Sequence, residues 1–140
     1  MDSVVSLHKY YMWATYMAAE LEKEMPKITR PISWADPKAL HAFMFMSYWY
    51  ATLYVVAEGW QELRLSDPAV DALLSTPQLA LLRRYRNGVF HFQKDYCDDR
   101  YRGLFDQGQA AKKWVNDLHH AFTAYFTQWF STYNLDGSLK

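Results

Sequence analysis

Cysteine is almost absent from this sequence, and so are the signals of export. The single cysteine, Cys97, has no second cysteine in the chain with which to form a disulfide. The first ten residues lack the basic start and the long apolar run of a secretory signal. We therefore expect a cytoplasmic protein in a reducing compartment.

An excess of charge of either sign is also lacking. The 15 basic side chains balance the 15 acidic ones, so the formal net charge is zero. Proteins that coat nucleic acid or acidic membranes by bulk electrostatics neutralise many phosphates at once, which takes a strong positive excess. Any contact with a polyanion must therefore be local.

A long charge-free run is present, but its composition differs from that of a membrane span. Residues 39–57 carry no charged side chain, yet His41, Ser47, Thr52 and three tyrosines are spread along them. A spanning helix needs about 20 mostly apolar residues, with its aromatic belt at the ends. We expect a central helix that is buried on most sides, and no membrane contact.

Motifs that bind metals or nucleotide cofactors are absent from the sequence. It contains no H-E-x-x-H pair, cysteine cluster, Walker A loop or G-x-G-x-x-G turn. The adjacent His119 and His120 would point about 100° apart on a helix, so they do not form a same-face metal pair. We expect neither a metal nor a cofactor.

What is present predicts one all-α domain. A chain of 140 residues, 51% of them hydrophobic, is long enough to close one core. No stretch alternates apolar and polar residues as a half-buried strand does, and no internal repeat occurs. The sequence therefore predicts a single domain over residues 1–140, folded as a bundle of four long helices plus one short helix.

Prolines mark the expected helix boundaries. Apolar spacings of three and four predict a first helix that Pro26 ends, followed by a linking loop with Trp34 as its anchor. Asp36, Asp67 and Thr76 each precede a proline, a pattern typical of an N-cap followed by the first helical residue. These three caps predict helices over residues 37–63, 68–75 and 77–94.

The final part of the chain is expected to form a loop and one more helix. Residues 95–108 are loop-like in composition. Asp106 and Gln109 have the spacing of a capping box, which predicts that the last helix begins there and reaches about Tyr133.

Residues 79–94 have two unlike faces when they are placed on a helix. The apolar arc, predicted to face the core, holds Leu81, Leu82, Tyr85, Val89 and Phe92. The opposite arc has no acidic residue and holds Arg83, Arg84, Arg86, Asn87, His91 and Lys94. Over residues 83–102, six basic side chains stand against three acidic ones, so a neutral protein has a positive neighbourhood here. A solvated helix face is the ordinary explanation of such a run.

The combination of side chains on this polar face also favours RNA cleavage. A histidine both takes and gives a proton near neutral pH, and an arginine offers a fork of donors that matches phosphate. Cutting RNA without a metal needs these two functions. Asn87 lies four residues before His91, where its amide would orient the ring or bind a phosphate oxygen.

The segment Arg86–His91, RNGVFH, resembles the R-x4-6-H motif of the HEPN (higher eukaryotes and prokaryotes nucleotide-binding) superfamily. The asparagine after the arginine and the position of the motif late in an all-α chain also fit that family. The resemblance implies a homodimer whose two motifs meet at the interface and form one metal-independent ribonuclease site. Arg86 would then hold the scissile phosphate, His91 would transfer protons and Asn87 would support them.

The same resemblance implies products that end in a 2′,3′-cyclic phosphate, and a role as a toxin or abortive-infection effector with a possible antitoxin or regulatory partner. Arg83, Arg84 and Lys94 are candidate RNA contacts. In HEPN toxins that are paired with a nucleotidyltransferase, a tyrosine stands where this chain has Gln93, so control by tyrosine modification is not expected to apply in the same way.

Several alternatives remain open from the sequence. Glu58 either reaches the motif as an additional polar partner or is an exposed carboxylate at a helix end. The chain either cleaves RNA or is a non-catalytic HEPN-like module that binds a nucleotide or a partner protein. A helical adaptor whose basic face docks an acidic protein is a third interpretation.

Overall fold

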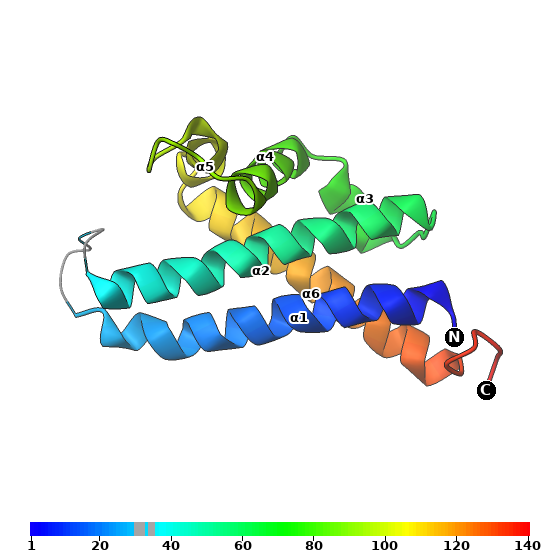
Figure 1. Ribbon diagram of the computed structural model, residues 1–140. Coiled ribbons are helices and arrows are strands. Elements are labelled where there is room, and N and C mark those ends of the chain that lie inside the picture. Colours follow the sequence, from blue (N-terminus) through cyan, green and yellow to red (C-terminus); the bar gives the residue numbers. More distant parts are fainter. Residues whose placement is uncertain (30–32, 34–35) are drawn as a thin grey trace.

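The computed structural model describes residues 1–29, 33 and 36–140 (Figure 1). The expected anchor Trp34 lies outside these residues. In the described part of the chain every regular element is a helix, apart from an isolated bridge between Tyr133 and Leu139. The all-α prediction is therefore confirmed.

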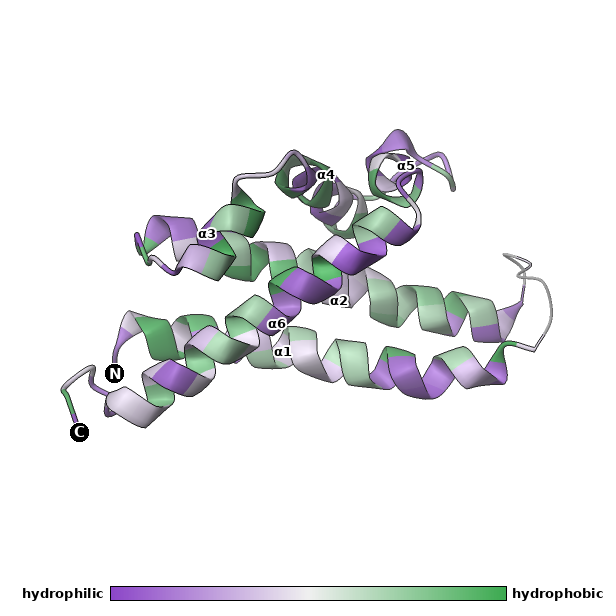
Figure 2. Ribbon diagram, turned by 180° about the vertical axis from the view of Figure 1, so that it is seen from behind, coloured by the Kyte–Doolittle hydropathy of each residue, from purple (hydrophilic) through white to green (hydrophobic). Residues whose placement is uncertain are grey.

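Three long helices form the frame. Helix α1 (Ser3–Glu24) is followed by a short 3₁₀ helix, η1 (Met25–Lys27), and helix α2 (Pro37–Glu62) returns antiparallel to α1. Helix α6 (Gln109–Thr132) crosses both on one side, as Figure 1 and the reverse view in Figure 2 show. Polar residues of α6 lie on its outward side in Figure 2, away from α1 and α2. The apolar sides of all three helices therefore face one another.

Three smaller helices lie on the side of α2 that faces away from α1 (Figure 1). They are α3 (Pro68–Leu74), α4 (Gln78–Phe90) and α5 (Asp99–Phe105). One cluster of buried side chains draws on all six α-helices, from Leu7 in α1 to Tyr85 in α4 and Phe122 in α6. Ser47 of α2 and Tyr85 share a buried hydrogen bond of 3.0 Å between their hydroxyl oxygens, which ties α4 to the frame.

The expected bundle of four long helices and one short helix is not what forms. Helices α1, α2 and α6 have 22, 26 and 24 residues, whereas α4 has 13 and both α3 and α5 have seven. Helix α5 lies within residues 95–108, which were expected to be a loop. It forms because the Asp98 carboxylate accepts from the Arg100 backbone N–H at 2.9 Å, and because Leu104 is buried in the core.

Two of the three predicted proline-linked caps are confirmed. The Asp36 carboxylate accepts from the Lys38 N–H, and the Asp67 carboxylate caps α3. Thr76 does not cap α4, because its hydroxyl donates to the Leu73 carbonyl at 2.7 Å and α4 begins only after Pro77.

The predicted capping box of the last helix is wrong. The N-cap of α6 is Gly108, at φ 54°, and no side chain caps it. Asp106 instead follows the last residue of α5 as its C-cap, because α5 occupies the segment before it.

The charge-free run forms the middle of α2 and is buried against its neighbours. Trp49, Leu53, Val56 and Trp60 of α2 all belong to the core. Within the described ranges, no helix is long and apolar enough to cross a bilayer.

Candidate RNA-cleavage site

Helix α4 ends inside the motif rather than after it. His91 has extended backbone angles, φ −122° and ψ 130°, and its N–H closes the last turn on the Asn87 carbonyl at 3.1 Å. The His91 carbonyl then accepts from Gln93 Nε2 at 2.6 Å, and Gln93 Oε1 accepts from Arg100 at 2.6 Å. These side-chain hydrogen bonds replace the helical ones, so the predicted helix through Lys94 is wrong beyond Phe90.

The helix end changes which residues share a face. Arg86 and Asn87 are on α4 as expected, but His91 and Lys94 follow it and do not belong to a helical face. Phe92, expected in the core, is 91% exposed, whereas Tyr85 is fully buried as predicted. Of the predicted polar arc, therefore, only Arg83, Arg84, Arg86 and Asn87 lie on the helix.

Gly88 in the middle of the motif has a packing role. A Cβ at Gly88 would lie 3.0 Å from Cε1 of Tyr101 in α5, and the Tyr101 hydroxyl donates to the Gly88 carbonyl at 2.5 Å. The glycine therefore allows α5 to approach α4 closely, which offsets its weak helix propensity.

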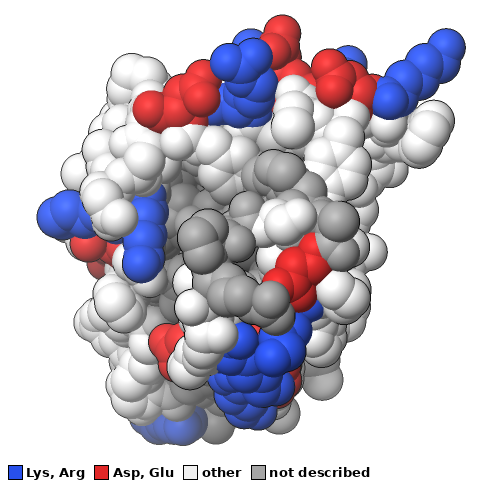
Figure 3. Space-filling model, turned by 90° about the vertical axis from the view of Figure 1, so that its left-hand side faces the viewer, with Lys and Arg blue, Asp and Glu red and all other residues white. Residues whose placement is uncertain are grey.

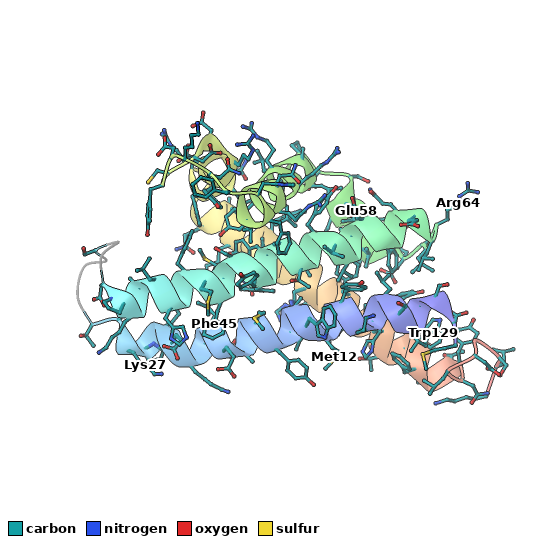
Figure 4. All side chains as sticks on the ribbon, viewed as in Figure 1. Met12, Lys27, Phe45, Glu58, Arg64 and Trp129 are labelled. Carbon is teal, nitrogen blue, oxygen red and sulfur yellow. The ribbon has the colours of Figure 1, made fainter. Side chains whose placement is uncertain are left out.

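Arg86 is held on one side by two residues of α2. Its guanidinium carbon lies 5.0 Å from the centre of the Tyr54 ring, in a cation–π arrangement, and its Nη2 lies 3.5 Å from Oε1 of Glu58. Arg86 Nε is buried and has no hydrogen-bond partner in the described part of the chain. Figure 4 shows Glu58 on the upper side of α2, toward α3 and α4. The guanidinium is therefore positioned while its side chain stays partly exposed.

The sequence analysis missed Tyr54, although a signal for it was available. Tyr54 and Glu58 are four residues apart on α2, so they lie on one face and approach the same neighbour. The sequence left open that Glu58 reaches the motif, but it did not identify Tyr54 as a neighbour of Arg86.

His91 is exposed at the end of α4. Its ring makes no hydrogen bond or ion pair with any described residue, and no hydrogen bond joins it to the Asn87 side chain. Asn87 contacts His91 through its backbone carbonyl only, so the expected orientation of the ring by the amide is not seen. Among the described residues of a single chain, no hydrogen bond links the side chains of Arg86 and His91.

Part of the positive neighbourhood is neutralised locally. Arg100 and Asp98 approach to 3.2 Å, and Arg102 and Asp99 to 3.9 Å. The pKa of Asp98 is lowered, chiefly by the backbone hydrogen bond from Arg100, then by the Arg100 side chain and the charge of Arg84. Acidic and basic atoms accordingly alternate along the upper edge of Figure 3, on the side where α5 lies in Figure 1.

The remaining cations are less constrained. Arg83 and Lys94 are exposed and make no ion pair with any described residue. Together with Arg84 they leave positive charge close to Arg86.

An exposed apolar strip adjoins the motif. It consists of Leu40, Met44 and Tyr48, spaced four residues apart on α2, and Phe90, the last residue of α4. The Tyr48 and Phe90 rings lie 6.3 Å apart, and Phe90 is 52% exposed. Such a strip on a surface is typical of an interaction site.

The described residues contain no group of three or more His, Cys, Asp or Glu side chains able to hold a metal ion. Comparison with known protein families, with curated proteins and with solved structures finds no match. Any function must therefore be argued from the residues themselves.

Proposed function

We propose that the protein is a metal-independent endoribonuclease of HEPN type that acts as a homodimer. The observation that carries the proposal is the position of Arg86, whose guanidinium is held by Tyr54 and Glu58 of α2, on the helix that ends at the exposed His91. A fixed cation and an accessible imidazole supply the two functions that phosphodiester cleavage needs without a metal.

The chemistry is transfer of the phosphate to the neighbouring hydroxyl. A histidine takes the proton of the ribose 2′-hydroxyl, whose oxygen attacks phosphorus. The bond from phosphorus to the 5′ oxygen breaks, and that oxygen receives a proton. The products are a 2′,3′-cyclic phosphate and a 5′-hydroxyl. Arg86 stabilises the negative charge that grows on the phosphate oxygens.

A dimer supplies the second motif histidine that a single chain lacks. Removing one proton and delivering another is simplest with two imidazoles, and each chain offers one His91 at the motif. A two-fold axis beside the apolar strip would cover Phe90 and bring both motifs to one interface. Asn87 then supports the phosphate, and Arg83, Arg84 and Lys94 contact the RNA on either side.

A cytoplasmic toxin or defence effector with a regulatory partner is the biological role that this activity favours, because unrestrained RNA cleavage harms the cell that makes it.

The deciding experiment is cleavage of labelled single-stranded and structured RNA in EDTA. Wild type is compared with Arg86→Ala and His91→Ala, and with His120→Ala as a control on α6. We expect wild type and the control to leave cyclic phosphate ends and both motif variants to be inactive. Intact RNA with a persistent dimer would overturn the proposal.

A second candidate is a HEPN-like binding module that does not cleave. It is favoured by the Arg86–Glu58 ion pair, since an arginine with an acidic partner in its own chain also serves structure. In this case the protein binds RNA or a nucleotide in a fluorescence polarisation assay, Arg86→Ala weakens binding, and no product appears.

A further inference from the structure

A cavity of about 440 Å³ lies at the end of the molecule away from the chain termini. Its walls come from the last turn of α1, the first half of α2, and α5 with the segment before it. This volume is within the range of small-molecule sites. The cavity is separate from the side chains of Arg86 and His91, neither of which lines it.

The walls are apolar and adaptable. Leu21, Met25, Phe43, Met46 and Phe105 are among the apolar side chains that line it. Methionine side chains have several rotatable bonds and fit unbranched chains of varied length. An apolar ligand with a flexible chain therefore matches this lining better than a polar one.

Among the described residues that line the cavity, Arg102 is the one with a charged side chain. Its partner Asp99 is 3.9 Å away, and the Arg102 and Asp99 side chains are 61% and 83% exposed. Such an ion pair is weak, so another carboxylate can replace Asp99.

We propose that this cavity binds a free medium-chain fatty carboxylate, with its alkyl chain against Leu21 and Met46 and its carboxylate on Arg102. The charge of Arg102 favours an anion, and the apolar lining favours an alkyl chain.

Cys97 provides a direct report of occupancy. It is the only cysteine in the chain, it is exposed, and it lines the cavity. A ligand in the cavity therefore slows alkylation of Cys97 by iodoacetamide, a neutral reagent that the ligand's charge does not repel.

The test is calorimetric titration with decanoate, together with the rate of Cys97 alkylation. Decanoate is compared with decyltrimethylammonium, which has the same chain and the opposite charge, and with bilayer vesicles of a zwitterionic lipid. We expect decanoate alone to bind and to protect Cys97. Equal binding of the cation, or binding of vesicles only, would overturn the proposal.

Two variants locate the site. Arg102→Gln is expected to weaken decanoate binding about tenfold, as for loss of one charged hydrogen bond. Arg64→Gln, at the opposite end of α2 in Figure 4, is the matched control and should bind as wild type does. Ala42→Leu narrows the cavity and should abolish binding, with thermal melting used to verify folding.

Absence of decanoate binding by the wild-type protein would also overturn the proposal. Binding by wild type with loss in Arg102→Gln supports it, whether or not the protein cleaves RNA.

Discussion

His119 and His91 show how differently one residue type is used in two regions of this molecule. His119 of α6 lies among the long helices, where Trp49 Nε1 donates to its Nδ1 at 2.9 Å and its Nε2 lies 3.1 Å from Thr15 Oγ1. Burial, with a smaller contribution from the charge of His120, lowers its pKa to about 4. His91 is exposed and its ring has no such partners.

His119 is held by hydrogen bonds within the fold, whereas the His91 ring is exposed. Because the Trp49 N–H occupies Nδ1, the proton of neutral His119 is on Nε2, where it is donated to Thr15. Both nitrogens are engaged and neither is free to exchange protons with a substrate. The His91 ring is exposed and makes no hydrogen bond with a described residue, so its nitrogens are accessible to a substrate.

The largest expected effect is on activity at the α4 end. His91→Ala should reduce RNA cleavage by about 10²–10⁴-fold, the usual contribution of a general acid or base. Its free energy of unfolding should change by less than about 0.5 kcal/mol, because the side chain is exposed. Product formation and urea unfolding measure the two quantities. A large loss of stability in His91→Ala would contradict the interpretation that the His91 side chain does not contribute to folding.

Substitution of the partly buried His119 should instead reduce stability and leave activity unchanged. His119→Ala leaves the Trp49 N–H without its acceptor and opens a cavity, so we expect a loss of about 2–3 kcal/mol in the free energy of unfolding. Urea unfolding measures it. RNA cleavage per folded molecule should be unchanged, and a specific loss of cleavage would contradict the assignment.

The pH dependence of stability should follow His119. The unfolded chain binds a proton near the ordinary pKa of 6.5, and the folded chain only near 4. Stability is therefore full above about 6.5 and falls as pH decreases toward 4. His8, whose pKa is also lowered by burial, acts in the same direction. Melting temperature against pH should fall less steeply for His119→Gln, and an unchanged slope would contradict this explanation.

The contact between α5 and the motif should contribute less to the free energy of unfolding than the contacts of His119 do. Tyr101→Phe removes the hydrogen bond to the Gly88 carbonyl and should cost about 1 kcal/mol in unfolding free energy. Denaturant unfolding measures the change, with Tyr16→Phe on the exposed side of α1 as the control. An equal effect in both variants would show that the contact does not stabilise α4.

The smallest effect is expected at Glu58. Its side chain is half exposed, so Glu58→Gln should change the free energy of unfolding by less than about 0.5 kcal/mol. RNA affinity, measured by fluorescence polarisation in a His91→Ala background, should decrease because Glu58 no longer helps to hold the guanidinium of Arg86. Stronger RNA binding would show instead that Glu58 competes with phosphate for Arg86.

The sequence identified the long helices and the short helix α3 well, but it did not identify the short helix α5. The caps at Asp36 and Asp67 depend on hydrogen bonds within three residues, which a local pattern reveals. Helix α5 has only seven residues and is stabilised by Leu104 in the core and Tyr101 against Gly88, contacts that no local pattern shows.

The candidate site divides in the same way. Arg86, Asn87 and His91 were evident from residue types and spacing, but the end of α4 at Phe90 was not. That end depends on Gln93 and on Arg100 from the next helix. Tyr54 and Glu58 approach Arg86 only because α2 packs beside α4.

By itself, the sequence determined that this chain is helical, that a long helix begins after Asp36, and which residue types are candidates for RNA chemistry, because these properties depend on spacing and on neighbours in the chain. Only the tertiary structure decided which histidine is engaged by neighbouring helices, where α4 stops, and what surrounds Arg86. Those outcomes depend on contacts between helices that are distant in sequence, and the packing of side chains from several elements selects among them.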